Sequence, residues 1–280
     1  MNYLLLFVVV CCASVQNILR KVYNTRTDKP TTYFFSLVSA LFALLFFVIS
    51  AKFRFEFNTE IIPYSVGFAV SYALALAGSV LAILNGPLSL TMLITSYSLI
   101  IPTFFGMVVY GDTLGIVGIT GLLLLGISLF LINKKGDNSG MSFKWFICVL
   151  VTFLGNGFCS VFQKVQQNNF DGAYKNEFMI VSLVMVCIFM IVAMIITKEK
   201  ADINNSLLPA AGCGIANGIV NLLVMVLTGV LPSIILYPSI AAGGIVIGYI
   251  VSVFVYKEKL TVMQNIGYIL GTASVILLNL

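Results

Sequence analysis

Ten long apolar runs fill most of this sequence, and they limit the possible folds more than any other feature. A helix needs about 20 mostly apolar residues to cross the ~30 Å hydrocarbon core of a bilayer. The runs are continuous, without the alternation of barrel strands, so they predict helices. We expect an all-α integral membrane fold whose ten transmembrane helices cover residues 3–22, 31–51, 62–84, 87–110, 114–133, 143–165, 177–197, 207–229, 232–256 and 261–279.

The composition supports the same class of protein. Hydrophobic residues make up 60% of the chain and charged residues only 9%, whereas soluble domains are about 25% charged. The first apolar run, "MNYLLLFVVVCCAS", lacks both the positively charged start and the Ala-x-Ala site of a secretory signal. We therefore interpret this run as the first membrane helix.

A short phrase occurs twice in the chain, first as "VVYGDTLG" and later as "FVYKEKLT". When residues 109–133 are placed on residues 255–279, eight of the 25 positions are identical, and Asp112 falls on Glu258. The match predicts an internal repeat, in which each copy carries a Val-Tyr pair, an acid and a following apolar helix.

The repeat divides the chain into two halves of five predicted helices each. The first half covers residues 1–134, a linker loop covers residues 135–142, and the second half covers residues 143–280. Because five is an odd number, the second half enters the membrane from the opposite side. The two halves are then inverted repeats, which is an architecture typical of secondary transporters with a site near the bilayer midplane.

Two longer segments carry a resemblance to a known family: "GPLSLTMLITSYSLIIPTFFGMVVYGDTL" and "LPSIILYPSIAAGGIVIGYIVSVFVYKEKL". The lysines of "ILRKV" and "VFQKV", Lys21 and Lys164, also match, 143 residues apart. With these segments the chain resembles the ten-helix EamA-like branch of the drug/metabolite transporter superfamily. The resemblance implies alternating-access transport of amino acids, nucleotide sugars, organic cations or other metabolites. Family members usually read Gly-Glu in the turn, where this chain has Gly-Asp and Lys-Glu.

Other functional classes find little support in the residues. The chain has no histidine, and its six cysteines form no CxxC pair, so the usual ligands and spacing of a metal centre are missing. We predict neither enzymatic activity nor a cofactor nor a metal. The net charge of +5 comes from basic residues between the spans, so we predict no nucleic-acid partner. The expected partners are a small-molecule substrate and membrane lipid, and the oligomeric state, monomer or homodimer, stays open.

The distribution of basic residues predicts an orientation. Cytoplasmic loops of membrane proteins carry an excess of Lys and Arg. Eleven of the 15 basic residues lie near the loops that follow odd-numbered spans, and four lie on the other side. We therefore expect both termini on the non-cytoplasmic side of a plasma or inner membrane.

No Asp or Glu lies deep in any predicted span, so the sequence predicts a site lined by neutral polar and aromatic side chains. Asn217 and Asn221 are four residues apart and share one face of the eighth span. Tyr72 is the counterpart of Asn217 in the other half, 145 residues earlier. The candidate substrate-binding residues are Gln16, Asn17, Tyr72, Ser96, Tyr97, Asn156, Asn217, Asn221, Tyr237 and Ser239.

Four further residues are candidates for gating or hinge roles: Pro102, Pro238, Lys21 and Lys164. A proline inside a helix disturbs its hydrogen bonding, and the two lysines lie near helix ends. Each candidate also has an ordinary structural role open to it. Polar side chains link membrane helices by hydrogen bonds, and a lysine near a helix end extends toward the lipid headgroups.

Together these patterns favour a secondary transporter for a small polar or zwitterionic metabolite that is amino-acid-, nucleoside- or sugar-like. An exporter or flippase for amphipathic, drug-like or lipid-linked molecules is the alternative. It requires a cavity that opens sideways to lipid and is walled by Phe and Met. The 22 Phe and 10 Met do not decide between the two, because surfaces that face lipid need such residues as well.

Overall fold

The computed structural model of the chain describes residues 2–27, 31–56, 58–85, 91, 95, 97–112, 115–132, 142–250 and 262–278. Within these ranges the protein is all-α and contains no strand. Its ten α-helices are α1 (Asn2–Arg26), α2 (Thr32–Ser50), α3 (Ile62–Asn85), α5 (Ile100–Tyr110), α6 (Ile116–Ile132), α7 (Phe143–Asn169), α8 (Lys175–Thr197), α9 (Ile203–Thr228), α10 (Ser233–Ile250) and α11 (Val262–Leu278).

Six of the described helices are long and apolar enough to cross a membrane, which indicates a membrane protein. The six segments are Asn2–Arg20, Thr32–Ser50, Thr59–Asn85, Phe143–Asn169, Lys175–Thr197 and Ile203–Thr228. Shorter apolar helical segments occur at Tyr97–Tyr110, Ile116–Ser128 and Ser233–Gly244. Nine of the ten predicted spans each correspond to one described helix.

The fourth predicted span, residues 87–110, is not one continuous α-helix in the structure. A 3₁₀ turn, η2 (Tyr97–Leu99), precedes α5, which has only 11 residues. Pro102 explains the change, because proline lacks an N–H group and its ring clashes with the carbonyl of the residue four positions earlier, here Ser98. Residues 86–90, 92–94 and 96 lie outside the described part of the chain.

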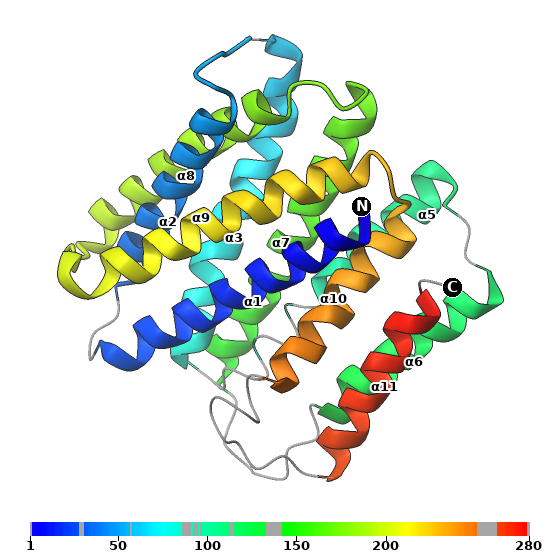
Figure 1. Ribbon diagram of the computed structural model, residues 1–280. Coiled ribbons are helices and arrows are strands. Elements are labelled where there is room, and N and C mark those ends of the chain that lie inside the picture. The colour runs from blue at the N-terminus through cyan, green and yellow to red at the C-terminus, as the bar shows by residue number, and fades with distance from the viewer. Residues whose placement is uncertain are drawn as a thin grey trace.

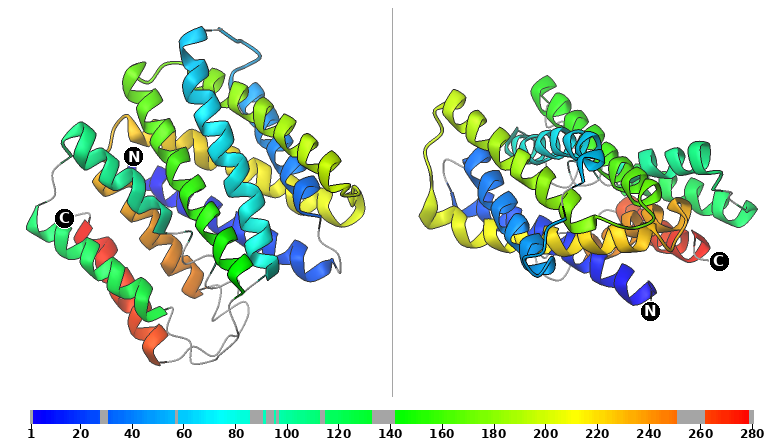
Figure 2. Two further views of the ribbon diagram at one scale, coloured as in Figure 1. Left: turned by 180° about the vertical axis from the view of Figure 1, so that it is seen from behind. Right: turned by 90° about the horizontal axis from the view of Figure 1, so that it is seen from above.

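The helices form two layers with a helix pair at each edge (Figures 1 and 2). In one layer α1 lies against α9, and in the other α3 lies against α7. At one edge α2 packs against α8, and at the opposite edge α6 packs against α11. Helix α10 lies between α1 and α11. The centre of the molecule is therefore the place where α1, α3, α7 and α9 meet.

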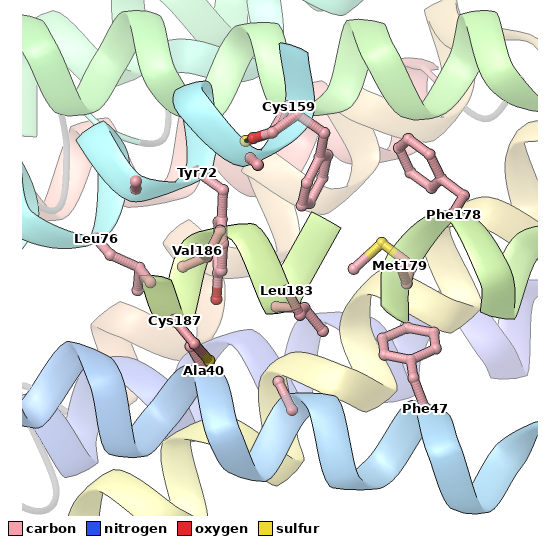
Figure 3. Packing of buried hydrophobic residues seen from close by; sticks show 14 of the residues in the cluster. Ala40, Phe47, Tyr72, Leu76, Cys159, Phe178, Met179, Leu183, Val186 and Cys187 are labelled. Atoms are coloured by element: carbon pink, nitrogen blue, oxygen red, sulfur yellow. Dashed lines mark hydrogen bonds between the residues drawn. The ribbon is translucent and has the colours of Figure 1, made fainter. Parts of the chain in front are cut away.

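The largest cluster of buried side chains fills the space between α2, α3 and α8 (Figure 3). Phe47 of α2, Phe68 of α3 and Phe178 of α8 are completely buried in it. The rings of Phe68 and Phe178 meet edge to face, with centroids 5.4 Å apart. Tyr72 lies at the side of this cluster that faces α9, so the apolar packing holds Tyr72 in position at the centre of the molecule.

A glycine permits the close approach of α3 and α7. A Cβ atom on Gly155 of α7 would lie 2.6 Å from the backbone oxygen of Ser71 in α3. Membrane helices commonly use such small residues where their backbones come close. This contact brings the polar side chains of α7 within reach of those on the neighbouring helices.

A carboxylate from the second half of the chain caps a helix of the first half. The carboxylate of Glu199, just after α8, accepts hydrogen bonds from the backbone N–H groups of Thr32 (3.0 Å), Tyr33 (2.8 Å) and Phe34 (2.8 Å) at the start of α2. The first N–H groups of a helix have no partner within the helix, and its N-terminus attracts negative charge. Glu199 therefore fixes the end of α8 to the beginning of α2.

Candidate functional site

A continuous network of neutral polar side chains crosses the centre of the molecule. The phenol of Tyr72 in α3 donates a 2.7 Å hydrogen bond to Oδ1 of Asn217 in α9. Nδ2 of Asn217 donates to Oε1 of Gln16 in α1, at 3.2 Å. Three helices from both halves of the chain therefore meet at one amide, near the middle of α3 and α9.

The network continues from α9 to α7. Nδ2 of Asn221 donates to Oδ1 of Asn217 at 2.8 Å and to its backbone oxygen at 2.9 Å. Oδ1 of Asn221 accepts a 2.7 Å hydrogen bond from Nε2 of Gln163 in α7. The helical spacing of four residues predicts that Asn217 and Asn221 share a face, and their hydrogen bond confirms it.

Both ends of the network leave amide groups unpaired. Among the described residues, Nε2 of Gln16 and Oε1 of Gln163 have no hydrogen-bond partner, and neither atom is sealed from solvent. The amides of Asn17 and Asn156 are partly buried and likewise have no partner in the described part of the chain. Amide groups that are not already paired can donate or accept hydrogen bonds to a bound molecule.

A second polar contact lies on the α10 side of the centre. The Tyr237 ring is fully buried, and its hydroxyl donates to the backbone oxygen of Ser160 in α7 at 3.2 Å. Ser239 is 2% exposed and has a partner of its own. Pro238 between them is buried inside α10. Tyr97 packs against the small α6–α10 cluster instead, so it does not join the central network.

The structure therefore brings together four of the predicted site residues, Gln16, Tyr72, Asn217 and Asn221. Ser96 lies outside the described residues. Asn17 and Asn156 lie on the helices that supply the network, and their side-chain amides make no hydrogen bond within the described part of the chain.

Among the candidate gating residues, Lys164 is buried rather than extended toward the headgroups. It is 5% exposed, its Nζ lies 3.5 Å from the backbone oxygen of Thr228, and it is 5.5 Å from the centre of the Tyr110 ring. A cation above an aromatic ring is attracted by the electron-rich face of the ring. Lys164 thereby joins the ends of α7, α9 and α5. Lys21 belongs to α1, and its side chain lies outside what the structure describes.

Asp112 closes the same end of the molecule. Its Oδ2 accepts a 2.9 Å hydrogen bond from the backbone N–H of Ser233, the first residue of α10. The approach is close because Gly106 of α5 has no side chain, and a Cβ atom there would lie 2.6 Å from Asp112 Oδ2. This carboxylate also interacts electrostatically with Lys164. Helices α5, α7, α9 and α10 are thus tied together at one end.

Sequence reasoning missed Gln163 and Arg20. Gln163 completes the network, and Arg20 lies close enough to Tyr72 and Cys213 to act on both electrostatically. The aligned segments "ILRKV" and "VFQKV" place these two residues at matching positions of the two halves. This shared position, one residue before the matching lysines, is a signal that could have identified both.

The network can hold a polar molecule by hydrogen bonds. Amide groups donate and accept, and a phenol can do both. All five network side chains are neutral, so the network offers hydrogen-bonding groups and no opposite charge. In a bilayer such groups have few alternative hydrogen-bond partners, so they tend to bond to one another or to a ligand.

Comparison with known proteins identifies a shared fold but no family. No protein-family profile and no curated protein matches the chain. Several solved structures match the chain. One of them, a crystal structure described only as that of a protein, has a TM-score of 0.78 and 12% identity, over 99% of this chain and 95% of that chain. The shared property is the fold. The arrangement of helices described above therefore occurs, along its whole length, in another protein.

Proposed function

We propose that the protein is a secondary membrane transporter that moves a small polar or zwitterionic metabolite by alternating access. The substrate binds at the central network around Asn217. Residues 1–134 and 143–280 act as inverted five-helix repeats joined by the linker 135–142. The two repeats rock about the network and expose it to one side of the membrane at a time.

The single observation that carries this proposal is the network itself. Five neutral polar side chains from α1, α3, α7 and α9 are hydrogen-bonded to one another at the centre. Nε2 of Gln16 and Oε1 of Gln163 lack a partner among the described residues and are not sealed from solvent, so both can bond to a further molecule. A bound polar molecule would supply the missing hydrogen bonds.

The helix pairing supports the two-repeat arrangement. If each helix is exchanged with its counterpart in the other half, the α1–α9 pair becomes the α7–α3 pair. The same exchange turns the α2–α8 pair and the α6–α11 pair each into itself. Tyr72 and Asn217, which are counterparts in sequence, are bonded directly to each other.

The contacts of Lys164 and Asp112 support a closed gate at one end of the molecule. Alternating access requires that the ties between α5, α7, α9 and α10 break when this end opens. Pro102 and Pro238 lie in two of the helices that must move, α5 and α10. Pro238 lies inside α10 and leaves a carbonyl without its usual helical partner, so α10 bends more easily there, whereas Pro102 lies in the first turn of α5.

Transport by purified protein in vesicles tests the proposal. Radiolabelled amino acids, nucleosides and sugars are offered to wild-type protein, and uptake of the accepted class is compared with that of Asn217→Leu. The variant should lose uptake of that class and still elute as a folded protein. Asn204→Leu, an exposed position in the first turn of the same helix, is the matched control and should transport normally. Unchanged uptake by Asn217→Leu would exclude this site.

A further inference from the structure

Arg20 of α1 is a charged residue close to the network, and the proposed function does not use it. Arg20 lies one helical turn after Gln16, so the two side chains share one face of α1. From this face Gln16 bonds to Asn217, and the Cys213 thiol donates to the backbone oxygen of Gln16 at 3.4 Å. Arg20 therefore lies beside α9 and next to the network.

The charge of Arg20 acts on side chains of two other helices. The residue is partly buried, and it interacts electrostatically with Tyr72 of α3 as well as with Cys213 of α9. It lies six residues before the end of α1, which is about 9 Å along the helix. Its positive charge is therefore within electrostatic reach of α3 and α9.

No carboxylate of the described residues forms an ion pair with this charge. Two described acids at this end of the molecule are already engaged: Glu199 caps α2, and Asp202 accepts hydrogen bonds from Asn205 at the start of α9. A guanidinium group offers five N–H donors in a planar fork that matches a carboxylate. Arg20 therefore presents an unmatched anion-binding group beside the network.

We propose that Arg20 binds the carboxylate of the transported substrate, so that the substrate is an amino acid or a comparable small polar carboxylic acid. The inference rests on the proposed function, and it narrows the substrate class at the same site. The carboxylate pairs with Arg20, and the polar remainder of the substrate bonds to the unpaired amide groups of the network. Lys198 and Lys200, at the same end of the molecule, raise the local concentration of anions.

Thermal unfolding of purified protein with matched ligands tests the assignment. Each amino acid is compared with its carboxamide, which lacks the negative charge, and uridine and glucose represent neutral polar substrates. A ligand that binds the folded state raises the melting temperature. In wild-type protein, one or more amino acids should raise it, and their carboxamides should not. In Arg20→Gln the apparent affinity for the acid should fall about ten- to hundredfold, since a charge-assisted hydrogen bond is lost.

Two further arginine variants control the experiment. Arg20→Lys keeps the positive charge but lacks the planar set of guanidinium N–H donors, so it should weaken binding less than Arg20→Gln. Arg54→Gln makes the same change at an exposed position after α2 and should bind as wild type does. Equal stabilisation by an acid and its carboxamide, or an acid effect retained in Arg20→Gln, would overturn the assignment.

The Asn217→Leu variant separates this inference from the proposed function. Ligand stabilisation that disappears in Asn217→Leu but persists in Arg20→Gln leaves the central site intact and overturns the role of Arg20. If only uridine or glucose stabilises the protein, and this effect requires Asn217, the central site is again left intact and the role of Arg20 is overturned. Stabilisation that persists in both variants overturns the site and the role of Arg20 together.

Discussion

The phenol oxygen of Tyr72 and the amide oxygen of Asn217 are 2.7 Å apart, although 145 residues separate them in sequence. The two residues also occupy corresponding positions in the two halves of the chain. Their hydrogen bond joins α3 to α9 at the point where α1 and α7 also meet. The network around this contact links four helices, and changes here should alter ligand binding more than folding.

Replacing Tyr72 by Phe should weaken ligand binding with little effect on stability. The change deletes one hydroxyl and leaves the ring packed in the α2–α3–α8 cluster. Hydrogen bonds between membrane helices contribute about 0.6 kcal/mol on average and about 1.7 kcal/mol at most, so the loss of unfolding free energy should fall in this range. Ligand-dependent melting shifts check the binding. Tyr3→Phe, an exposed position of α1, should change neither property.

Replacing Lys164 by Met should loosen the closed end of the molecule. The methionine fills similar space but cannot bond to the Thr228 oxygen or attract the Tyr110 ring as a cation. Opening of this end then becomes easier, and amide hydrogen exchange at the start of α10 should accelerate. Lys52→Met, at an exposed position, serves as the control. Unchanged hydrogen exchange in Lys164→Met would show that Lys164 does not hold this end of the molecule closed.

Replacing Glu199 by Ala should destabilise the fold by about 0.5–2 kcal/mol, the usual effect of losing a helix cap. Three backbone N–H groups at the start of α2 lose their acceptor. Thermal unfolding in detergent measures the change. Glu56→Ala removes the same side chain at an exposed site after α2, and it should leave the melting temperature within error of wild type. Equal melting temperatures for both variants would contradict the capping role.

Replacing Gly155 by Ala should separate α3 from α7. The new methyl group would lie 2.6 Å from the Ser71 oxygen and 2.9 Å from the Ala75 nitrogen, and backbone atoms at such distances must move. Overpacking of this kind typically lowers stability by about 1–3 kcal/mol. Gly244→Ala is the matched control, because no atom lies within 4 Å of the added methyl position. A melting temperature of Gly155→Ala equal to that of Gly244→Ala would show that the contact is relaxed.

Cysteine labelling should place the two ends of α2 on opposite sides of the membrane. Lys52 follows the end of α2, whereas Lys198 lies beside its beginning, next to the Glu199 cap. The positive-inside rule predicts that Lys198 is cytoplasmic. In intact cells an impermeant maleimide should label Lys52→Cys and spare Lys198→Cys. The reverse pattern would invert the predicted orientation.

The helices and their limits could be predicted because apolar runs between charges and prolines fix them locally. The described ends of α2, α3 and α8 differ from the predicted spans by no more than two residues. The broken fourth span could not be located as well, since the 3₁₀ turn at Tyr97–Leu99 depends on how the chain accommodates Pro102. A proline marks a disturbance without showing how the chain accommodates it.

Part of the candidate site could be predicted, and the reason is again local spacing. Asn217 and Asn221 share a helix face, and internal symmetry points from Asn217 to Tyr72. The contribution of Gln163 depends on the rotation of α7 against α9, which is set by packing contacts such as the one at Gly155. The position of Arg20 also depends on packing, because a basic residue near a helix end can point inward or toward the headgroups. Only the tertiary contacts distinguish these two cases.

The Glu199 cap has a consequence for biosynthesis. The N–H groups at the start of α2 emerge from the ribosome about 165 residues before the carboxylate that binds them. Until α8 has been inserted, these donors depend on water or headgroups at the bilayer surface. The first half of the chain therefore remains locally unfinished during translation, and its maturation has to wait for the second half to arrive.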